Sequence, residues 1–222
     1  MISLSRTGRT LQRMNRARQT PTVPLEAGSG PDNPPCPACG EPLFGWVGER
    51  RGLDGAVSRC ESCGLGVVGE PGSAEEALRE IDRLGAGGSL RIANRASVAA
   101  ALGGAGWAGL EPGARYLFTV DAVQRLVAVR DQVVVRRRWA PGAGIAAMWQ
   151  TVLNSVTFGR NVALGALGLA EAVTAEQRWQ RRIDALICVV LAIPAMAIAA
   201  PLELCGAAVG RGAAVSLRLQ LL

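Results

Sequence analysis

Two short cysteine motifs constrain this chain more than any other feature. Cys36-Pro-Ala-Cys39-Gly40 and Cys60-Glu-Ser-Cys63-Gly64 share the pattern C-x2-C-G and are separated by twenty residues. A two-residue gap lets both thiolates of a motif face one cation, and the glycine permits the positive φ that such a turn needs. Two motifs at this separation predict a four-thiolate zinc ribbon, with hairpin strands near 46–47 and 56–57 that turn near 52–55.

Other interpretations of these cysteine motifs agree less well with the sequence. A thioredoxin-type motif needs a βαβ context that is missing here, and disulfides need an oxidising compartment. Four thiolates leave zinc no open coordination position. A zinc ion bound by Cys36, Cys39, Cys60 and Cys63 is therefore expected to be structural and not catalytic. The remaining cysteines, Cys188 and Cys205, lie in apolar stretches and are expected to be small buried hydrophobes.

The composition removes several classes of enzyme. The chain has no His, and all 24 of its basic residues are Arg. Histidine triads, histidine zinc ligands, Schiff-base lysines and the P-loop lysine are therefore excluded. Gly64-Leu-Gly66-Val-Val-Gly69 matches a dinucleotide-binding pattern, but its first glycine belongs to the second cysteine motif. No strand precedes it in the required way, so we expect no nucleotide loop there.

Residues 1–35 predict a disordered basic tail. Five arginines come first and a stretch rich in proline and glycine follows, with no apolar segment of the kind that a secretory signal requires. Such a tail can contact nucleic acid or anionic lipid, or can simply be solvated.

From Ser73 onward the pattern becomes α/β. Ser73 and Glu76 form a capping box before a helix over 74–84, and glycines follow that helix. We expect a second helix over about 120–130 and strands near 89–93, 132–137 and 213–221.

These segments resemble the late part of class I S-adenosylmethionine-dependent methyltransferases. The resemblance is carried by residues 36–139 and 211–222, and its motifs occur in the family's order: Glu76-Ala-Leu-Arg-Glu-Ile-Asp-Arg-Leu84, Gly87-Gly88-Ser-Leu-Arg-Ile92, Trp107-Ala-Gly-Leu-Glu-Pro112, Arg115-Tyr-Leu-Phe-Thr119 and Ala122-Val-Gln-Arg-Leu126. Tyr116 stands where the family usually has His. Many members carry a four-cysteine ribbon ending in Cys-Gly-Leu, as Cys63-Gly64-Leu65 does here. The resemblance implies one sheet for the three strands, with the last strand antiparallel between the other two.

One departure from the family decides the expected activity. Only nine residues separate Cys63 from Ser73, where the family has its first strands, its glycine-rich cofactor loop and the acid that binds the ribose. A doubly wound sheet binds its nucleotide at the ends of those strands. We therefore expect no catalytic and no cofactor-binding residues in this chain, and no binding of S-adenosylmethionine.

The region 140–210 is apolar and poor in charge. Residues 185–202 form an eighteen-residue run without a charge, between Arg181-Arg182 and Asp184 on one side and Glu203 on the other. This length is at the lower limit of a membrane span. The resemblance implies a further option, an amphipathic helical insertion between the last two strands that lies on a membrane surface or on a lipid-like substrate. The remaining alternative is a buried helical hairpin that covers the sheet.

The sequence thus predicts an α/β protein with five segments: a basic tail (1–35), a zinc ribbon (36–70), a partial methyltransferase-like unit (73–139), an apolar helical region with a possible membrane segment (140–210) and a final strand (211–222).

The predicted function is that of a methyltransferase-like protein without activity. We expect it on the cytoplasmic side of a membrane or in the cytoplasm, not secreted, and we expect a lipid surface as its partner. Two alternatives stay open: an active methyltransferase completed by a partner chain or a longer gene product, and a nucleic-acid-binding ribbon. Against nucleic acid, no aromatic stripe accompanies the arginines.

Overall fold

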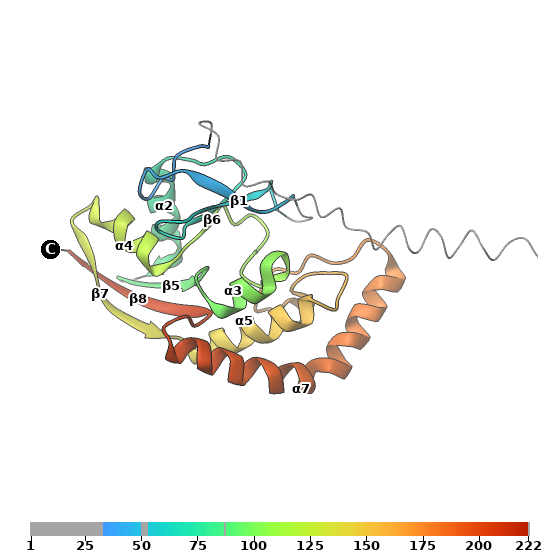
Figure 1. Ribbon diagram of the computed structural model, residues 1–222. Helices are drawn as coiled ribbons and strands as arrows, with labels where there is room; N and C mark the ends of the chain where they lie inside the picture. Colours follow the sequence, from blue (N-terminus) through green and yellow to red (C-terminus); the bar gives the residue numbers. More distant parts are fainter. Residues whose placement is uncertain (1–32, 50–52, 87, 222) are drawn as a thin grey trace, which may run out of the picture.

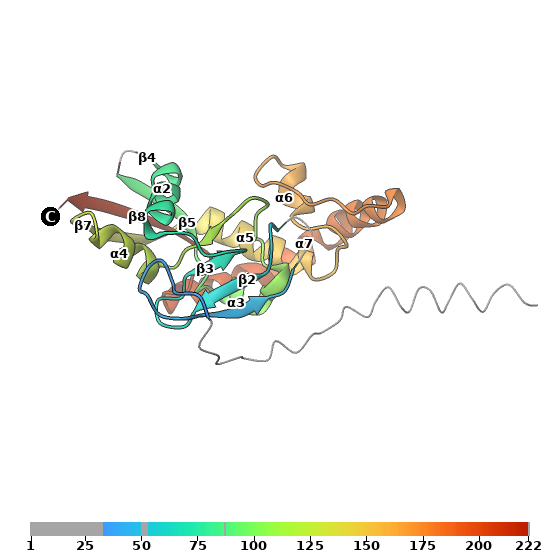
Figure 2. The same ribbon diagram turned by 90° about the horizontal axis from the view of Figure 1, so that it is seen from above.

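The computed structural model describes residues 33–49, 53–86 and 88–221. Most of the predicted basic tail lies outside these residues. The described chain is a mixed α/β protein with two sheets, and every strand pair in its described part is antiparallel. Figure 1 shows the first sheet at the top of the molecule and a long helix along the opposite, lower side. In both views the second sheet lies at one end (Figures 1 and 2).

The first sheet contains the cysteine ribbon. Its order is β1-β2-β3-β6, formed by Leu43–Val47, Val57–Cys60, Gly66–Val68 and Tyr116–Leu117. The hairpin predicted between the cysteine motifs is confirmed as β1 and β2, which extend further than predicted. The glycine pattern after Cys63 runs into β3, and β6 joins the ribbon from a distant part of the chain.

The second sheet has the order β4-β5-β8-β7, formed by Gly85–Ala86, Ser89–Ala93, Ala214–Leu221 and Gln132–Trp139. The predicted arrangement of the three long strands is confirmed, because β8 lies antiparallel between β5 and β7. β5 alternates strictly between exposed and buried residues. This alternation is the period-two signature of a strand with one covered face.

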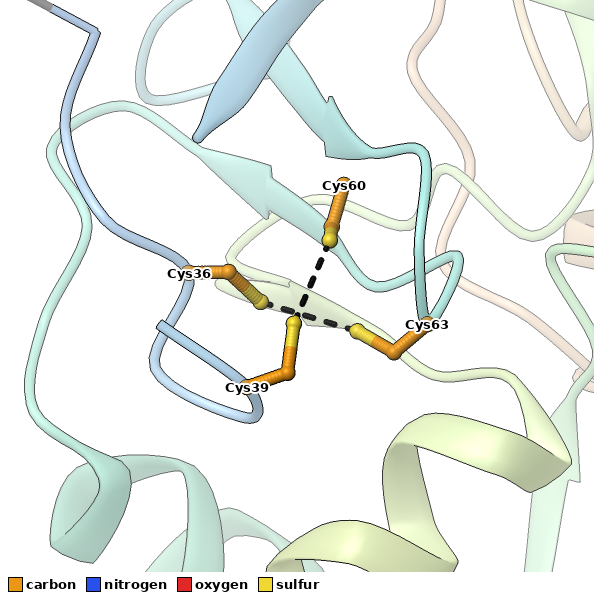
Figure 3. Close-up of side chains that lie close together, drawn as sticks. All are labelled: Cys36, Cys39, Cys60 and Cys63. Atoms are coloured by element: carbon orange, nitrogen blue, oxygen red, sulfur yellow. Dashed lines mark hydrogen bonds between the residues drawn. The ribbon is translucent and has the colours of Figure 1, made fainter. Parts of the chain in front are cut away.

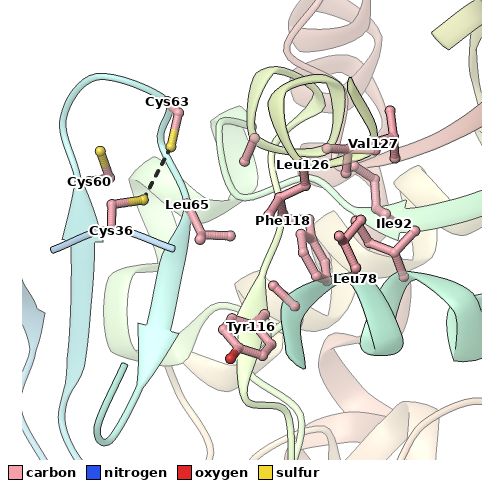
Figure 4. Packing of buried hydrophobic residues seen from close by; sticks show 14 of the residues in the cluster. Cys36, Cys60, Cys63, Leu65, Leu78, Ile92, Tyr116, Phe118, Leu126 and Val127 are labelled. Atoms are coloured by element: carbon pink, nitrogen blue, oxygen red, sulfur yellow. Dashed lines mark hydrogen bonds between the residues drawn. The ribbon is translucent and has the colours of Figure 1, made fainter. Parts of the chain in front are cut away.

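Two helices cover that face, α2 (Ala74–Leu84) and α4 (Val120–Ala128). Both begin where the sequence predicts, and the Ser73–Glu76 capping box is present. α4 ends two residues before its predicted end. One buried cluster joins these helices to the inner side of the sheet and to the ribbon (Figure 4): Cys36, Cys60, Cys63, Leu65, Leu78, Ile81, Leu90, Ile92, Phe118, Leu126, Val127, Val215 and Leu217.

The rest of the chain is helical. It contains α3 (Val98–Gly103), a 3-10 turn (Gly104–Gly106), α5 (Pro141–Asn154), α6 (Val162–Ala166) and α7 (Arg178–Ala208). α7 is one continuous helix that packs along α5 and contains both Pro194 and Pro201. Among the described residues it is the single helix long and apolar enough, by length and composition, to cross a membrane. Only 11% of its apolar window is buried, so the buried-hairpin alternative is wrong.

Thr119 links the ribbon to α4. Its Oγ1 donates a hydrogen bond to the Cys63 carbonyl at 2.6 Å and accepts one from the Ala122 N–H at 3.0 Å, as the N-cap of α4. The residue is buried. One hydroxyl therefore fixes both the start of the helix and the end of the second cysteine motif.

We expect Thr119→Val to lower the free energy of unfolding by about 2 kcal/mol, because it leaves two buried backbone groups without a partner. Denaturant unfolding measures this change. Thr119→Ser retains the hydroxyl and is the matched control, so an equal loss in both variants would contradict the hydrogen-bond assignment.

Candidate metal centre

The four predicted ligands come together in the structure. Their sulfur atoms all lie within 4.8 Å of one another. The Sγ atoms of Cys36 and Cys63 are 3.6 Å apart, and those of Cys39 and Cys60 are 3.5 Å apart. Figure 3 shows the four side chains converging from two sides, one pair from each motif. This cluster could hold a metal ion.

Both motifs form the tight turn that the sequence predicts. The Gly40 N–H donates to the Cys36 carbonyl at 2.8 Å, and the Gly64 N–H donates to the Cys60 carbonyl at 3.0 Å. Gly40 and Gly64 have φ of 78° and 75°, which confirms the predicted positive φ. At Gly64 a Cβ atom would also lie 2.8 Å from the Thr119 methyl group, so both conformation and space favour glycine there.

Hydrogen bonds and burial shift the pKa values of the clustered cysteines in opposite directions. A bond from Cys63, aided by the backbone N–H groups of Ala38 and Cys39, lowers the pKa of Cys36 to about 5. Its hydrogen bond to Cys36 and burial raise the pKa of Cys63. Thiolates are the form of cysteine that binds metals.

Arg95 lies beside the second motif. Its Nη1 donates to the Gly64 carbonyl at 3.2 Å, and its guanidinium lies 4.5 Å from the centre of the Trp46 ring. Burial lowers the pKa of Arg95 to about 10, which still leaves it charged at neutral pH. Four thiolates around a divalent cation carry a net charge of about −2, and the half-buried guanidinium of Arg95 offsets part of that charge. The sequence analysis missed Arg95, because nothing near it in the chain indicates contact with a motif thirty-one positions away.

The cluster is closed to substrates. Cys36, Cys60 and Cys63 are buried and Cys39 is partly buried. Four sulfurs fill a tetrahedral shell, so a metal held here has no open position for a reacting group. This arrangement can stabilise the fold and cannot activate water or substrate at the metal.

The two other cysteines lie outside the cluster. Cys205 is exposed and Cys188 is partly exposed on α7. The expectation that both are buried is therefore wrong for Cys205. Its apolar neighbours in the sequence belong to a helix that covers the protein with one side only, so an apolar sequence context does not imply burial here.

The residues after the second motif do not form a cofactor loop. Gly66 lies in β3, and Gly69 packs against the Asp54 carbonyl and Gly55. Within the described residues both glycines are thus engaged in the ribbon, so this stretch offers S-adenosylmethionine no glycine-rich turn.

A cavity of about 690 Å³ lies at the outer edge of β5. It is bordered by Arg91–Ala93 of β5, the loop around Glu111, and α5. Burial, with a smaller effect of Glu171, raises the pKa of Glu111. The sequence indicated no site here, since alanine and glycine supply most of the lining.

Comparison with models of protein families, with curated proteins and with solved structures finds no match to this chain. The proposed function is therefore based on the geometry of the cysteine cluster, the second sheet and α7.

We expect the purified chain to contain one metal ion and Cys60→Ser to lose it, because the variant removes one of four ligands. Elemental analysis of protein purified without chelator measures the ion. Cys205→Ser removes a cysteine outside the cluster and should leave the metal content unchanged. Equal metal content in wild type and Cys60→Ser would contradict the assignment.

Proposed function

We propose that this chain is a methyltransferase-derived, zinc-stabilised protein that has no cofactor site of its own and works attached to a membrane. The observation that carries the proposal is the second sheet, in which the last strand, β8, lies antiparallel between β5 and β7. The resemblance to class I methyltransferases implies this arrangement. The order of the motifs along the chain, with the ribbon before them, supports the same origin.

Zinc is the proposed metal. A tetrahedral shell with Zn–S bonds of about 2.3 Å places its sulfurs about 3.8 Å apart. Two of the Sγ separations, 3.5 and 3.6 Å, are close to this value, and all four sulfurs lie within 4.8 Å of one another. Four thiolates also form the donor set typical of structural zinc centres.

The role of the chain is proposed to be non-catalytic. In the family the cofactor loop follows the first strand, and here the chain passes directly from the ribbon to α2 through β3. Since the resemblance begins only at the late strands, the protein retains the part of the domain that supports the sheet and lacks the part that binds the cofactor.

We expect the zinc-loaded chain to bind S-adenosylmethionine no more tightly than millimolar, because neither a glycine-rich loop nor a ribose-binding acid is present. Isothermal titration calorimetry measures this affinity. A micromolar dissociation constant, or methyl transfer from labelled cofactor to a cellular extract, would overturn the non-catalytic assignment.

One observation favours a second candidate, an active methyltransferase completed by a partner chain. β4 pairs only with Ser89 and Leu90, so the rest of the outer edge of β5 has no neighbouring strand among the described residues. The large cavity lies at this same edge. A partner could add the strands and the cofactor loop there. This candidate predicts that protein isolated in its native complex binds S-adenosylmethionine while the purified chain does not, and absence of binding in both preparations excludes it.

Membrane attachment is proposed to occur through α7. Its 31 residues are predominantly apolar, and most of its apolar window faces away from the protein. Exposed apolar surface of this extent is typical of interaction sites. Arg178, Arg181 and Arg182 at its start favour the cytoplasmic side, where basic residues gather in membrane proteins.

We expect cell fractionation to place the full-length protein in the membrane pellet and high salt to leave it there, because apolar burial in lipid is insensitive to ionic strength. Immunoblotting of the fractions measures the distribution. Recovery of the intact protein as a soluble monomer without detergent would contradict the attachment.

A further inference from the structure

Both ends of α7 are fixed to the rest of the protein by buried carboxylates. Asp184 accepts hydrogen bonds from the N–H groups of Phe158 and Gly159, at 2.7 and 2.8 Å. Glu203 accepts bonds from the Ala213 N–H at 2.7 Å and from Trp139 Nε1 at 2.8 Å. Asp184 is 1% exposed and Glu203 is 0% exposed. These are the two acids that flank the uncharged run, and both point into the protein.

The middle of α7 is attached as well. Trp149 Nε1 of α5 donates a hydrogen bond to the Ala192 carbonyl at 2.9 Å. Ala195, Ala199 and Gly206 are buried on the side of the helix that carries Asp184 and Glu203. The inner side of α7 is therefore in contact with the protein along the whole uncharged run.

This attachment is incompatible with a membrane span. Nineteen residue steps separate Asp184 from Glu203, which is about 28 Å of helix. The hydrocarbon core of a bilayer is about 30 Å thick, so a spanning α7 would place the two carboxylates near opposite surfaces. The residues bonded to them belong to the same folded body and would have to follow them through the lipid. α7 can meet a bilayer with this fold intact only by lying in the plane of its surface.

The outer side of α7 is suited to such a position. Its exposed apolar side chains recur at helical spacing, and Val189 and Ile193 are 77% and 82% exposed: Trp179, Ile183, Leu186, Val189, Val190, Ile193, Ile198 and Leu204. No charged residue occurs on this side between Arg182 and the end of the helix. At its start Trp179 packs edge-on against the exposed Phe158, with ring centres 5.6 Å apart. Aromatic side chains of this kind favour the headgroup layer.

A second exposed surface lies on the second sheet, on the face opposite α2 and α4. Ser216 pairs with Arg91 on one side and with Arg138 on the other, and Arg218 pairs likewise with Ser89 and Arg136. We call the four arginines of this grid, Arg91, Arg136, Arg138 and Arg218, the arginine face.

The arginine face carries charge that the described protein does not neutralise. All four side chains are exposed, and none forms an ion pair with a carboxylate within residues 33–49, 53–86 and 88–221. Arg136 and Arg218 lie directly opposite each other on neighbouring strands. Like charges in this position destabilise a sheet, and a bound anion removes the repulsion. The grid therefore fits a multivalent anionic partner.

The two surfaces are joined. Arg138 directly precedes Trp139, whose indole bonds Glu203 of α7. In Figure 1, α2 and α4 lie above the second sheet, so its arginine face is directed toward the lower side of the molecule, along which α7 runs. The arginine face and α7 thus border the same side of the molecule.

We infer that the outer side of α7 and the arginine face form one docking surface for an anionic lipid bilayer, on which α7 lies in the plane of the membrane. The inference rests on the proposed membrane attachment and adds its orientation and its preference for acidic headgroups. Nucleic acid offers the same phosphate charge but no apolar phase for α7, so the lipid surface is the partner that satisfies both parts.

Flotation with vesicles tests the lipid preference on the full-length, zinc-loaded chain. We expect binding to phosphatidylcholine vesicles that contain about 30% phosphatidylglycerol to be roughly 600-fold tighter than to pure phosphatidylcholine, since each of the four arginines near an anionic surface contributes about fivefold. Arg136→Gln/Arg138→Gln/Arg218→Gln should reduce this difference to about fivefold and keep the binding to pure phosphatidylcholine.

The matched control removes the same charge from the opposite side of the second sheet. Arg79, Arg83 and Arg125 are exposed on α2 and α4. We expect Arg79→Gln/Arg83→Gln/Arg125→Gln to bind both vesicles as wild type does. Equal losses of affinity for anionic vesicles in the two triple variants would overturn the lipid-binding role of the arginine face. The same conclusion would follow if the variant at 136, 138 and 218 lost affinity for a single-stranded oligonucleotide and none for lipid.

Thiol labelling tests the orientation. In a Cys188→Ala/Cys205→Ala background, Arg178→Cys and Val209→Cys each place one thiol at an end of α7. An impermeant maleimide added outside sealed vesicles should label both variants, because both ends of an in-plane helix stay on one side. Labelling of only one end indicates a span and overturns the in-plane inference while membrane attachment stands. Failure of the wild-type chain to float with either vesicle would instead overturn the proposed attachment itself.

Discussion

The hydrogen bond from Thr119 to the Cys63 carbonyl connects the metal cluster to the rest of the described chain. Three of the four cysteines belong to the same buried cluster as α2, α4 and the inner side of the second sheet. A ribbon of this size cannot bury enough surface to fold by apolar contacts alone, and metal binding supplies the missing free energy in such small units. Because the ribbon and the α/β part share one core, a metal bound by the cysteines also stabilises the position of α4 and, through it, the sheet.

The local elements were predictable from the sequence because each depends on short-range chemistry. The Ser73–Glu76 capping box starts α2, the spacing of the two cysteine motifs brings four sulfurs together, and the alternation in Ser89–Ala93 defines a strand with one covered face. The order of β5, β8 and β7 came from the resemblance, since periodicity alone does not say which strand lies in the middle.

The contacts that the sequence could not reveal are long-range. Asp184 and Glu203 flank the uncharged run in the sequence, and the structure shows both buried against partners elsewhere in the chain. Arg95 reaches Gly64 across a similar distance. Pro194 and Pro201 favoured a break, but α7 continues through both, and each lies on its exposed side. Figure 1 shows the helix curving around α5. Helices that wrap a core in this way are commonly convex toward their surroundings.

An in-plane α7 also determines where the metal cluster lies. Figure 1 places the ribbon on the side of the molecule opposite the helix, so a docked protein holds its cysteines away from the lipid and in the aqueous phase. Partly buried Cys39 is the ligand with the most solvent contact, and thiolates in this position survive best in a reducing compartment. The basic start of α7 favours the cytoplasmic side on separate grounds. Cysteine chemistry and charge distribution therefore favour the same side of the membrane, although they concern opposite sides of the protein. The cavity at the edge of β5 lies between these two sides, next to a strand edge that has few partners of its own.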